Sequence, residues 1–398
     1  MTAISACPIL ATSAEAVAVA RELAADFATG AAERDRQRHL PFAEIDLLSA
    51  SGLLAITVPG GYGGAGLPAS TVTEVIRILA TADPNIAQIP HSHFVYVNLL
   101  RLAGSDEQLR HHAELLLHGA RIANAQSERS SATVADIATT VRPVGGRFRI
   151  DGAKYYCTGS LFADTLAVLT RLEDPNGESG LADGQYVAFL PADTPGVRII
   201  DDWQALGQRT TGSGTVVFDG VLVDGSALVS RAPAVNEPTG YGAFAQLLHA
   251  AIDVGIARGA LEAAASFVRE KSRPWFEAGV TQAGDDPLLI QRFGELAVSV
   301  QAAESALTVA GATVDGADAA EASLAVAGAK ILADKAANEV SSALFEVSGT
   351  RSAAADLNLD HFWRNARTHT LHDPVRWKYQ HIGRAVLHGT PPPLHSAI

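Results

Sequence analysis

The sequence predicts an α+β protein in which a helical segment comes first, a β-rich segment follows and a helical bundle ends the chain. Two observations carry this prediction. Apolar residues recur at helical spacing on both sides of a central region, whereas that region holds short β-rich runs separated by glycine turns. The 398 residues are enough for two or three domains. We place the domains at residues 1–119, 120–234 and 235–398.

The first segment, from about residue 13 to 118, is predicted to be mostly helical. The runs "SAEAVAVARELAADFATGAAERDRQ" and "STVTEVIRILATAD" place apolar residues at helical spacing. The run "GSDEQLRHHAELLLHG" begins with Ser105 and Asp106, residue types that cap helices, and ends before Gly119. Between these runs, "VPGGYGGAGLP" lacks the Lys and Ser/Thr of a P-loop, so we interpret it as a structural turn.

The middle segment, from about Arg121 to Ser230, is predicted to form a small β-barrel domain. It contains the β-rich runs "RFRIDGAKYYCTGS", "TLAVLTRL", "QYVAFLP" and "TVVFDGVLVDG". The pairs "GG" at 145–146 and "DG" at 151–152 and 219–220 supply turn chemistry. Strands at this spacing favour an antiparallel barrel or a sandwich.

The last segment, from about residue 240, is predicted to form a four-helix bundle. Its long amphipathic runs are "FAQLLHAAIDVGIARGALEAAASFVREK", "DPLLIQRFGELAVSVQAAESALTVAGATV" and "EASLAVAGAKILADKAANEVSSALFEVSG". Their small and apolar stripes are more extensive than one chain would cover. We therefore expect a homotetramer.

Composition excludes several classes of protein. The net charge of −13 argues against a nucleic-acid partner, which needs clustered Lys and Arg. The two cysteines, Cys7 and Cys157, make neither a disulfide framework nor a metal set. The N-terminal run has no basic residues ahead of its apolar ones, and no apolar run reaches membrane length. We expect a cytoplasmic protein without a metal or a membrane partner.

The segment "HFWRNARTHTLHDPVRWK", from His361 to Lys378, concentrates Arg, His and Trp in a chain that is only 18% charged. Cationic, aromatic and titratable groups at this density indicate an anionic ligand or a reaction nearby. The segment raises the question of what needs His369, His372 and Asp373 together.

Motifs along nearly the whole chain resemble those of the acyl-CoA dehydrogenase family. "GLLAITVPGGYGGAGLP" is similar to the family's N-terminal segment, and "NAQSERSSATVAD" to its flavin-binding segment. "KYYCTGS" and "LGQRTTGSGTVVFDGVLV" resemble its two β-domain motifs. The resemblance implies an N-terminal helical domain, a central β-barrel domain and a C-terminal four-helix bundle. One fold serves many reactions, so the reaction must come from the site.

Three departures from that family bear on the reaction. His372 in "LHDP" stands where the family has its glutamate base. "KSRPWFEAG" and "EVSGTRSA" replace two motifs that hold the adenylate half of FAD across a subunit interface. The resemblance therefore implies FMN rather than FAD. Arg273 and Arg351 stand where a terminal phosphate would be clamped, for which guanidinium groups are suited.

This set of departures resembles flavin-dependent monooxygenases such as dibenzothiophene monooxygenase, and more closely the sulfur-acquisition oxidoreductases of the SfnB type. The resemblance is carried by "DDWQALGQRTTGSG", "HAAIDVGIARGAL" and "WRNARTHTLHDPVRWKY". It implies a two-component enzyme to which a separate NAD(P)H-dependent flavin reductase delivers reduced FMN. O2 would add at flavin C4a, and the hydroperoxide would oxygenate a small, organosulfur substrate.

Three residues are assigned to catalysis. Thr158 maps to the position whose hydroxyl faces flavin N5, and His372 maps to the far side of the reacting centre. A histidine with an ordinary pKa near ~6.5 can donate a proton to nascent peroxide, which a carboxylate at neutral pH cannot. His93 in "IPHSHF" is the third candidate, and its alternative is a helix-lining histidine satisfied by the backbone. His91 beside it is interpreted as structural.

Further residues are assigned to the cofactor. Asn124 and Ser127 in "NAQSE" are expected to hydrogen-bond the pyrimidine edge of the flavin. Trp203 either covers the isoalloxazine or packs against the barrel edge. His369 is assigned to cofactor binding together with Arg273 and Arg351. Asp373 is the weaker candidate for orienting His372, since adjacent residues on a helix do not face each other.

Two competing functions stay open on the sequence alone. A true acyl-CoA dehydrogenase would hold FAD and use His372 as its α-proton base. A non-catalytic protein that keeps the flavin fold would only bind or assemble, and failure to bind any flavin would support this alternative.

Overall fold

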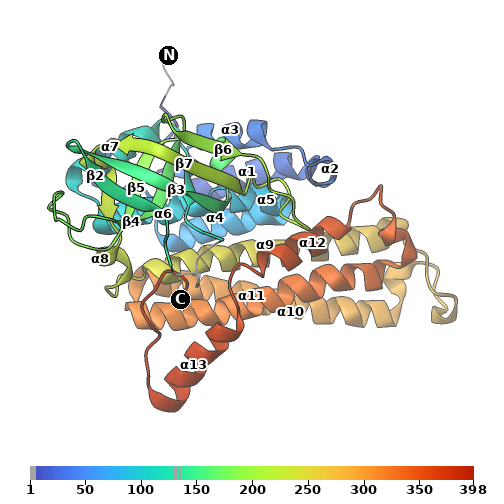
Figure 1. Cartoon of the computed structure of the whole chain (residues 1–398). Coiled ribbons are helices and arrows are strands. Elements are labelled where there is room, and N and C mark those ends of the chain that lie inside the picture. The colour runs from blue at the N-terminus through green and yellow to red at the C-terminus, as the bar shows by residue number, and fades with distance from the viewer. Residues whose placement is uncertain (1–5, 130–132, 134–135) are drawn as a thin grey trace.

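The computed structural model describes residues 6–129, 133 and 136–398. The predicted order of helical, β and helical segments is confirmed: blue helices lead into a green sheet and then into the yellow-to-red helices (Figure 1). Residues 130–132 and 134–135, within the segment that resembles the family's flavin-binding motif, lie outside the described part. Within the described residues, no helix combines the length and apolarity that crossing a bilayer requires.

The first helical segment ends where the sequence predicts. Its last helix begins after Ser105, whose hydroxyl accepts from the Gln108 backbone in a capping box. The helices are α1 (Ser13–Ala28), α2 (Ala31–Gln37), α3 (Phe42–Ala50), α4 (Ala69–Ala82), α5 (Pro84–Gln88), α6 (His91–Ala103) and α7 (Asp106–Leu117).

The middle segment forms one sheet in the order β6-β7-β3-β2-β4-β5-β8, with β1 beside β4. The predicted antiparallel ladder is wrong at two pairings, because β1 and β2 both run parallel to β4. Within the described residues the end strands β6 and β8 do not pair, so the barrel is open. The strands are β1 (Ile122–Ala125), β2 (Thr140–Val144), β3 (Arg147–Cys157), β4 (Thr165–Leu172), β5 (Gln185–Pro191), β6 (Val197–Ile200), β7 (Gly214–Val223) and β8 (Leu228–Ser230).

Both faces of β4 are buried, which positions the sheet against the helices. Leu166 and Val168 point into the core that the sheet makes with β3 and β7. Ala167 and Leu169, on the other face, join the larger core shared with the helices. The alternation follows the two-residue period of a strand. On the side that faces the helices, β1 packs beside α6.

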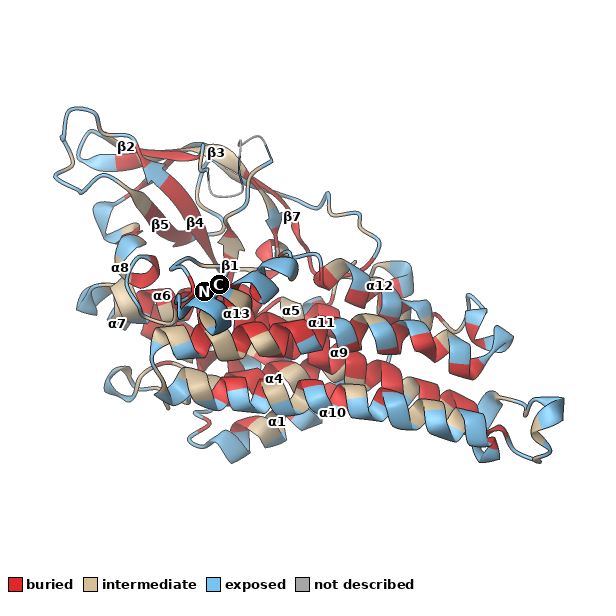
Figure 2. Cartoon of the chain, turned by 90° about the horizontal axis from the view of Figure 1, so that it is seen from below, coloured by how far each residue is buried: buried red, intermediate tan, exposed pale blue. Residues whose placement is uncertain are grey.

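The C-terminal helices are α8 (Ala232–Val235), α9 (Tyr241–Lys271), α10 (Pro287–Gly316), α11 (Ala319–Ser348), α12 (Asp360–His369) and α13 (Arg376–His388). Every residue of α9 from Tyr241 to Ala257 is buried, the polar residues Gln246, His249 and Asp253 included, because this part of the helix lies in the core. By contrast, Figure 2 shows exposed residues along much of α10.

Two glycines let α9 approach α4 closely. A Cβ on Gly255 would lie 2.6 Å from the carbonyl oxygen of Arg77, and one on Gly259 would lie 2.5 Å from that of Thr81. These contacts are too short for any side chain. The "GIARG" run therefore brings the centre of α9 against the N-terminal helices, where its polar residues meet the site described next.

Candidate active site

A cavity of about 560 Å³ lies among the sheet, α5, α6, the first half of α9 and the turn after α12. Its volume is in the usual range for small-molecule sites. Five of the residues predicted from sequence line it together, although the first and last are 248 positions apart in the chain: Asn124, Ser127, Thr158, Trp203 and His372.

Buried polar atoms at the cavity are left without partners. Within the described residues, no hydrogen bond reaches Gln88 Oε1, Asn124 Oδ1 or either polar atom of the Gln208 side chain. All three residues line the cavity. Since buried polar groups are nearly always hydrogen-bonded, this arrangement fits a ligand with its own donors and acceptors, as a flavin ring has.

A chain of hydroxyl groups fixes the donor and acceptor roles of the Thr158 hydroxyl. Thr211 Oγ1 donates to the Gln208 carbonyl at 2.9 Å, and its oxygen lies 2.6 Å from Ser213 Oγ. Ser213 must then donate to Thr211, so in the 2.7 Å contact between Thr158 and Ser213 the donor is Thr158. Thr158 is left with oxygen lone pairs on the cavity side, where its hydroxyl can accept a hydrogen bond.

The loop that carries Gln208 is held by α12. Gln208 has φ 52°, a conformation that non-glycine residues rarely adopt. Its N–H donates to Asn365 Oδ1 at 2.7 Å. A Cβ on the preceding Gly207 would lie 2.0 Å from the Arg364 carbonyl oxygen. Part of the Arg- and His-rich segment therefore serves to clamp this loop rather than to bind an anion.

Trp203 forms a wall of the cavity. Its indole Nε1 donates to the Gln208 carbonyl at 2.7 Å, and its ring meets the Tyr156 ring edge-on at 6.0 Å between centroids. Tyr156 also lines the cavity and has φ 58°. The indole is therefore fixed in place beside the space that the ring system of a cofactor would fill.

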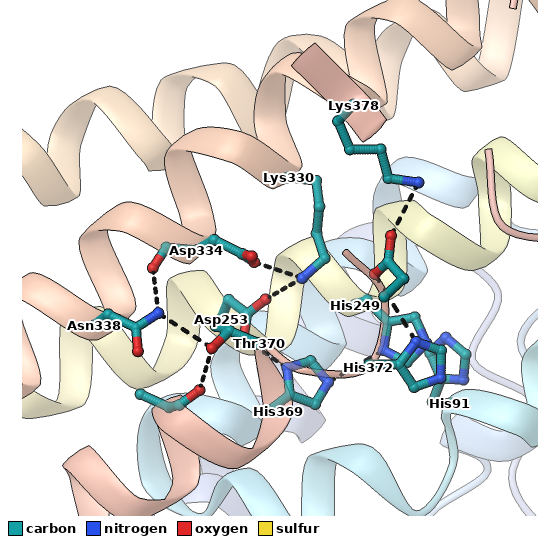
Figure 3. Close-up of polar contacts among 12 residues, drawn as sticks. His91, His249, Asp253, Lys330, Asp334, Asn338, His369, Thr370, His372 and Lys378 are labelled. Atoms are coloured by element: carbon teal, nitrogen blue, oxygen red, sulfur yellow. Dashed lines mark hydrogen bonds and ion pairs between the residues drawn. The ribbon is translucent and has the colours of Figure 1, made fainter. Parts of the chain in front are cut away.

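Three imidazoles stack at the cavity floor (Figure 3). His249 lies between His91 and His372, with ring centroids 3.8 Å from each. The His91 Nε2 lies 3.0 Å from the Ala245 carbonyl oxygen. Burial lowers the pKa of His91 to about 3 and lowers that of His249 well below its ordinary value. Both rings are therefore neutral at physiological pH.

His372 is the half-exposed member of this stack, with 47% of its side chain accessible. Its Nδ1 lies 3.9 Å from Asp373 Oδ1, and Lys378 Nζ lies 3.1 Å from Asp373 Oδ2. Burial raises the pKa of Asp373, but the neighbouring His372 imidazole and the Lys378 charge outweigh burial and lower the pKa overall. Asp373 is therefore an anion beside His372. The two residues lie in the turn after α12 and not on a helix, so the geometric argument against their pairing does not apply.

Three family models together match most of the chain. The acyl-CoA dehydrogenase N-terminal, middle and C-terminal domain models match residues 12–120, 123–221 and 247–377. The chain belongs to the acyl-CoA dehydrogenase family.

Within the acyl-CoA dehydrogenase family, the chain is similar to several monooxygenases. Dibenzothiophene monooxygenase of Rhodococcus qingshengii is 35% identical over 94% of both chains. The probable FMNH2-dependent monooxygenase SfnC of Pseudomonas putida is 31% identical over 97% of this chain and 98% of its own. The crystal structure of FMN-bound TdsC from Paenibacillus sp. A11-2 superposes with a TM-score of 0.89, at 35% identity, covering 96% of this chain and 100% of that one.

Two predicted histidines of this family member lie outside the cavity. His93 Nε2 lies 2.7 Å from the Leu54 carbonyl oxygen, and its Nδ1 accepts from the Ile122 N–H at 3.2 Å. Both nitrogens are thus occupied by backbone, which is the structural alternative the sequence left open. His369 lies behind His249 and hydrogen-bonds to it instead of lining the cavity.

The two predicted phosphate-binding arginines lie at the far end of the bundle from the cavity of their own chain. Arg351 Nη1 donates to the Lys271 carbonyl at 2.6 Å. Lys271 ends α9, and the 22 residues that separate it from His249 correspond to about 33 Å along the helix. Arg273 follows two residues later. Within one chain, neither arginine is brought to the cavity.

Sequence reasoning missed His249 and Gln208 and interpreted His91 as structural. A signal for His249 was present, because His249 and Asp253 are four residues apart in "HAAIDVGIARG" and so share one face of a helix. Gln208 had no such signal, since its role depends on a backbone conformation that the loop adopts against α12.

Proposed function

We propose that the protein is an FMNH2-dependent monooxygenase that transfers one oxygen atom of O2 to a small organosulfur substrate. The observation that carries the proposal is the set of unpartnered polar atoms on Asn124 and Gln208, beside a histidine at the position of the family's carboxylate base. The similarity to proteins named dibenzothiophene monooxygenase and FMNH2-dependent monooxygenase supports it.

Each lining residue has a part in this proposal. Asn124 and Gln208 would hydrogen-bond the polar edge of the flavin, with Ser127 at the open side of the cavity. Thr158 would accept a hydrogen bond from a flavin N–H. Bound reduced FMN would supply the electrons that activate O2, so that one oxygen atom goes to the substrate and the other leaves as water. His372 would donate the proton that the departing oxygen requires, with Asp373 holding its imidazole.

The flavin phosphate would be held by a second copy of the chain. Arg273 and Arg351 are about 33 Å from the cavity along α9, so only a neighbouring subunit can bring them to it. Large apolar side chains on α10 are exposed and would be covered by such a neighbour: Leu288, Ile290, Val298 and Val309. We propose a homotetramer on these grounds, fed with reduced FMN by a separate NAD(P)H-dependent flavin reductase.

The test supplies the purified protein with FMN, NADH, a flavin reductase and dibenzothiophene or a smaller sulfide under 18O2. The expected result is one 18O atom in a sulfoxide, or two in a sulfone formed by a second turnover, in each case dependent on the protein. Reductase and flavin without the protein are the control. Failure to bind FMN or reduced FMN would overturn the proposal. Anaerobic bleaching of bound FAD by an acyl-CoA would favour the dehydrogenase instead.

A further inference from the structure

A buried chain of polar groups runs from His249 into the centre of the bundle (Figure 3). His249 Nδ1 lies 3.1 Å from His369 Nε2, and His369 Nδ1 lies 2.5 Å from Asp253 Oδ1. The side chains of His369 and Asp253 are completely excluded from solvent. Three ring or carboxylate groups are thus connected in a line that starts at the cavity and ends about one helical turn below His249 on α9.

The far end of this chain is charged. Lys330 Nζ donates to Asp253 Oδ2 at 2.7 Å and to Asp334 at 2.6 Å. Burial raises the pKa of Asp253, but its interactions with His369 and Lys330 outweigh burial and lower the pKa overall, so this carboxylate stays ionised. Burial and the neighbouring Asp253 charge raise the pKa of Asp334 to about 8. Of the two carboxylates, Asp253 is the one that stays ionised at neutral pH.

This charge fixes the tautomers of both histidines. An ionised Asp253 can only accept, so His369 carries its proton on Nδ1. The neutral His369 ring then presents a lone pair at Nε2, and His249 must donate to it from Nδ1. His249 is left with its lone pair at Nε2. None of the described residues hydrogen-bonds that nitrogen, and His249 lines the cavity.

We infer that Asp253 and His369 form a buried relay that holds His249 with a proton-accepting Nε2 at the cavity floor. The inference rests on the proposed function, because the overall reaction moves two hydrogens from reduced FMN to the water that leaves. A group that receives a proton in the cavity and later returns it is therefore needed. His249 supplies that group, and His369 and Asp253 are its positioning residues.

The uptake and return of this proton need no further reactant. When His249 Nε2 takes a proton from the cavity, its Nδ1–H stays hydrogen-bonded to His369 Nε2, and the His369 Nδ1–H stays hydrogen-bonded to the ionised Asp253, whose negative charge offsets the positive charge on His249. The reverse step returns the proton to the cavity. The stacked neighbours His91 and His372 hold the His249 ring in the plane that keeps this line intact.

The test reads the tautomer directly. Protein labelled with [15N-imidazole]histidine and free of flavin is examined by magic-angle-spinning NMR, with His249 assigned by a His249→Gln variant. We expect an unprotonated Nε2 and a protonated Nδ1 at His249. Asp253→Asn, whose amide can donate to His369, should reverse both tautomers and lower kcat for oxygenation by roughly 10²–10⁴-fold. The dissociation constant for FMN should stay unchanged.

Asp334→Asn is the matched control. It removes the second carboxylate that pairs with Lys330 and leaves Asp253, His369 and His249 unchanged, so the His249 tautomer should be retained. An Nε2-protonated His249 in the unmodified protein overturns the inference even if Asp253→Asn fails to fold. So does full activity in a folded Asp253→Asn variant. An unmodified protein with the expected tautomer but no oxygenase activity would instead overturn the proposed function and leave the relay in place.

Discussion

The ammonium of Lys330 lies 2.7 Å from the Asp253 carboxylate, with 1% and 0% of the two side chains exposed to solvent. Replacing Lys330 with Met would leave Asp253 as an uncompensated charge in the core. We expect the free energy of unfolding to fall by about 3–5 kcal/mol, the usual cost of breaking a buried pair. Chemical denaturation measures this. Lys335→Met, at an exposed position of the same helix, is the control and should change stability little.

His372→Ala should separate oxygen consumption from oxygenation. The variant should still bind FMN, because the unpartnered polar atoms and the proposed phosphate contacts lie elsewhere. Product formed per NADH oxidised should fall by roughly the 10²–10⁴-fold typical of losing an acid–base group, with H2O2 released in its place. His111→Ala, at an exposed position on α7, provides the comparison. An unchanged product yield would remove His372 from the mechanism.

Arg351→Ala should weaken the binding of FMN more than that of riboflavin. The expected loss for FMN is about 1.5–3 kcal/mol, the range for a hydrogen bond to a charged group, because only FMN carries the phosphate. Titration with both flavins measures it. Arg110→Ala, at a surface ion pair with Asp106, should leave both affinities unchanged. Equal weakening of FMN and riboflavin would show that Arg351 does not contact the phosphate.

Acid should destabilise the protein through its buried neutral histidines. Burial, with a smaller contribution from the charge of His111, lowers the pKa of His112 to about 4. Between pH ~6.5 and about 4 the unfolded chain binds this proton and the folded chain does not. The free energy of unfolding should therefore decrease by about 1.4 kcal/mol per pH unit for this residue. Above pH ~6.5 its contribution is fully present.

Replacing His112 isolates its contribution to the pH dependence of unfolding. His112 packs on Phe189 at 5.0 Å between ring centroids, and no described residue hydrogen-bonds it. His112→Phe should flatten the pH dependence of unfolding by about 1.4 kcal/mol per unit over this window. Leu116→Ala on the same helix lowers stability without removing a titrating group, so it should keep the original slope. A slope unaffected by His112→Phe would contradict the assignment.

The order of the domains could be predicted from sequence because it depends on local periodicity. Helical spacing, the cap at Ser105 and glycine turns are all short-range signals, and each reappears in the structure. The parallel pairing of β1 with β4 was not readable. It joins residues about forty positions apart, and nothing in either strand favours one direction over the other.

The site residues could be predicted from sequence where they stand at positions that the resemblance to the family identifies. Thr158 and His372 are found at the cavity because the motifs around them resemble a known arrangement. His91 and His93 could not be ranked from sequence, since they lie two residues apart on one helix. Which of them points toward α9 depends on the orientation of α6 against the bundle.

The distance between Arg351 and the cavity of its own chain has a genetic consequence. If each cavity is completed by a neighbour, two inactive alleles can compensate for each other. Co-expression of His372→Ala and Arg351→Ala chains would yield mixed assemblies in which some cavities combine an intact His372 with an intact Arg351 from the adjoining copy. At an FMN concentration too low to saturate the Arg351→Ala chain, activity would reappear in the cross although neither parent shows it. The converse also follows, because an Arg351→Ala chain in excess would silence cavities that carry no mutation of their own.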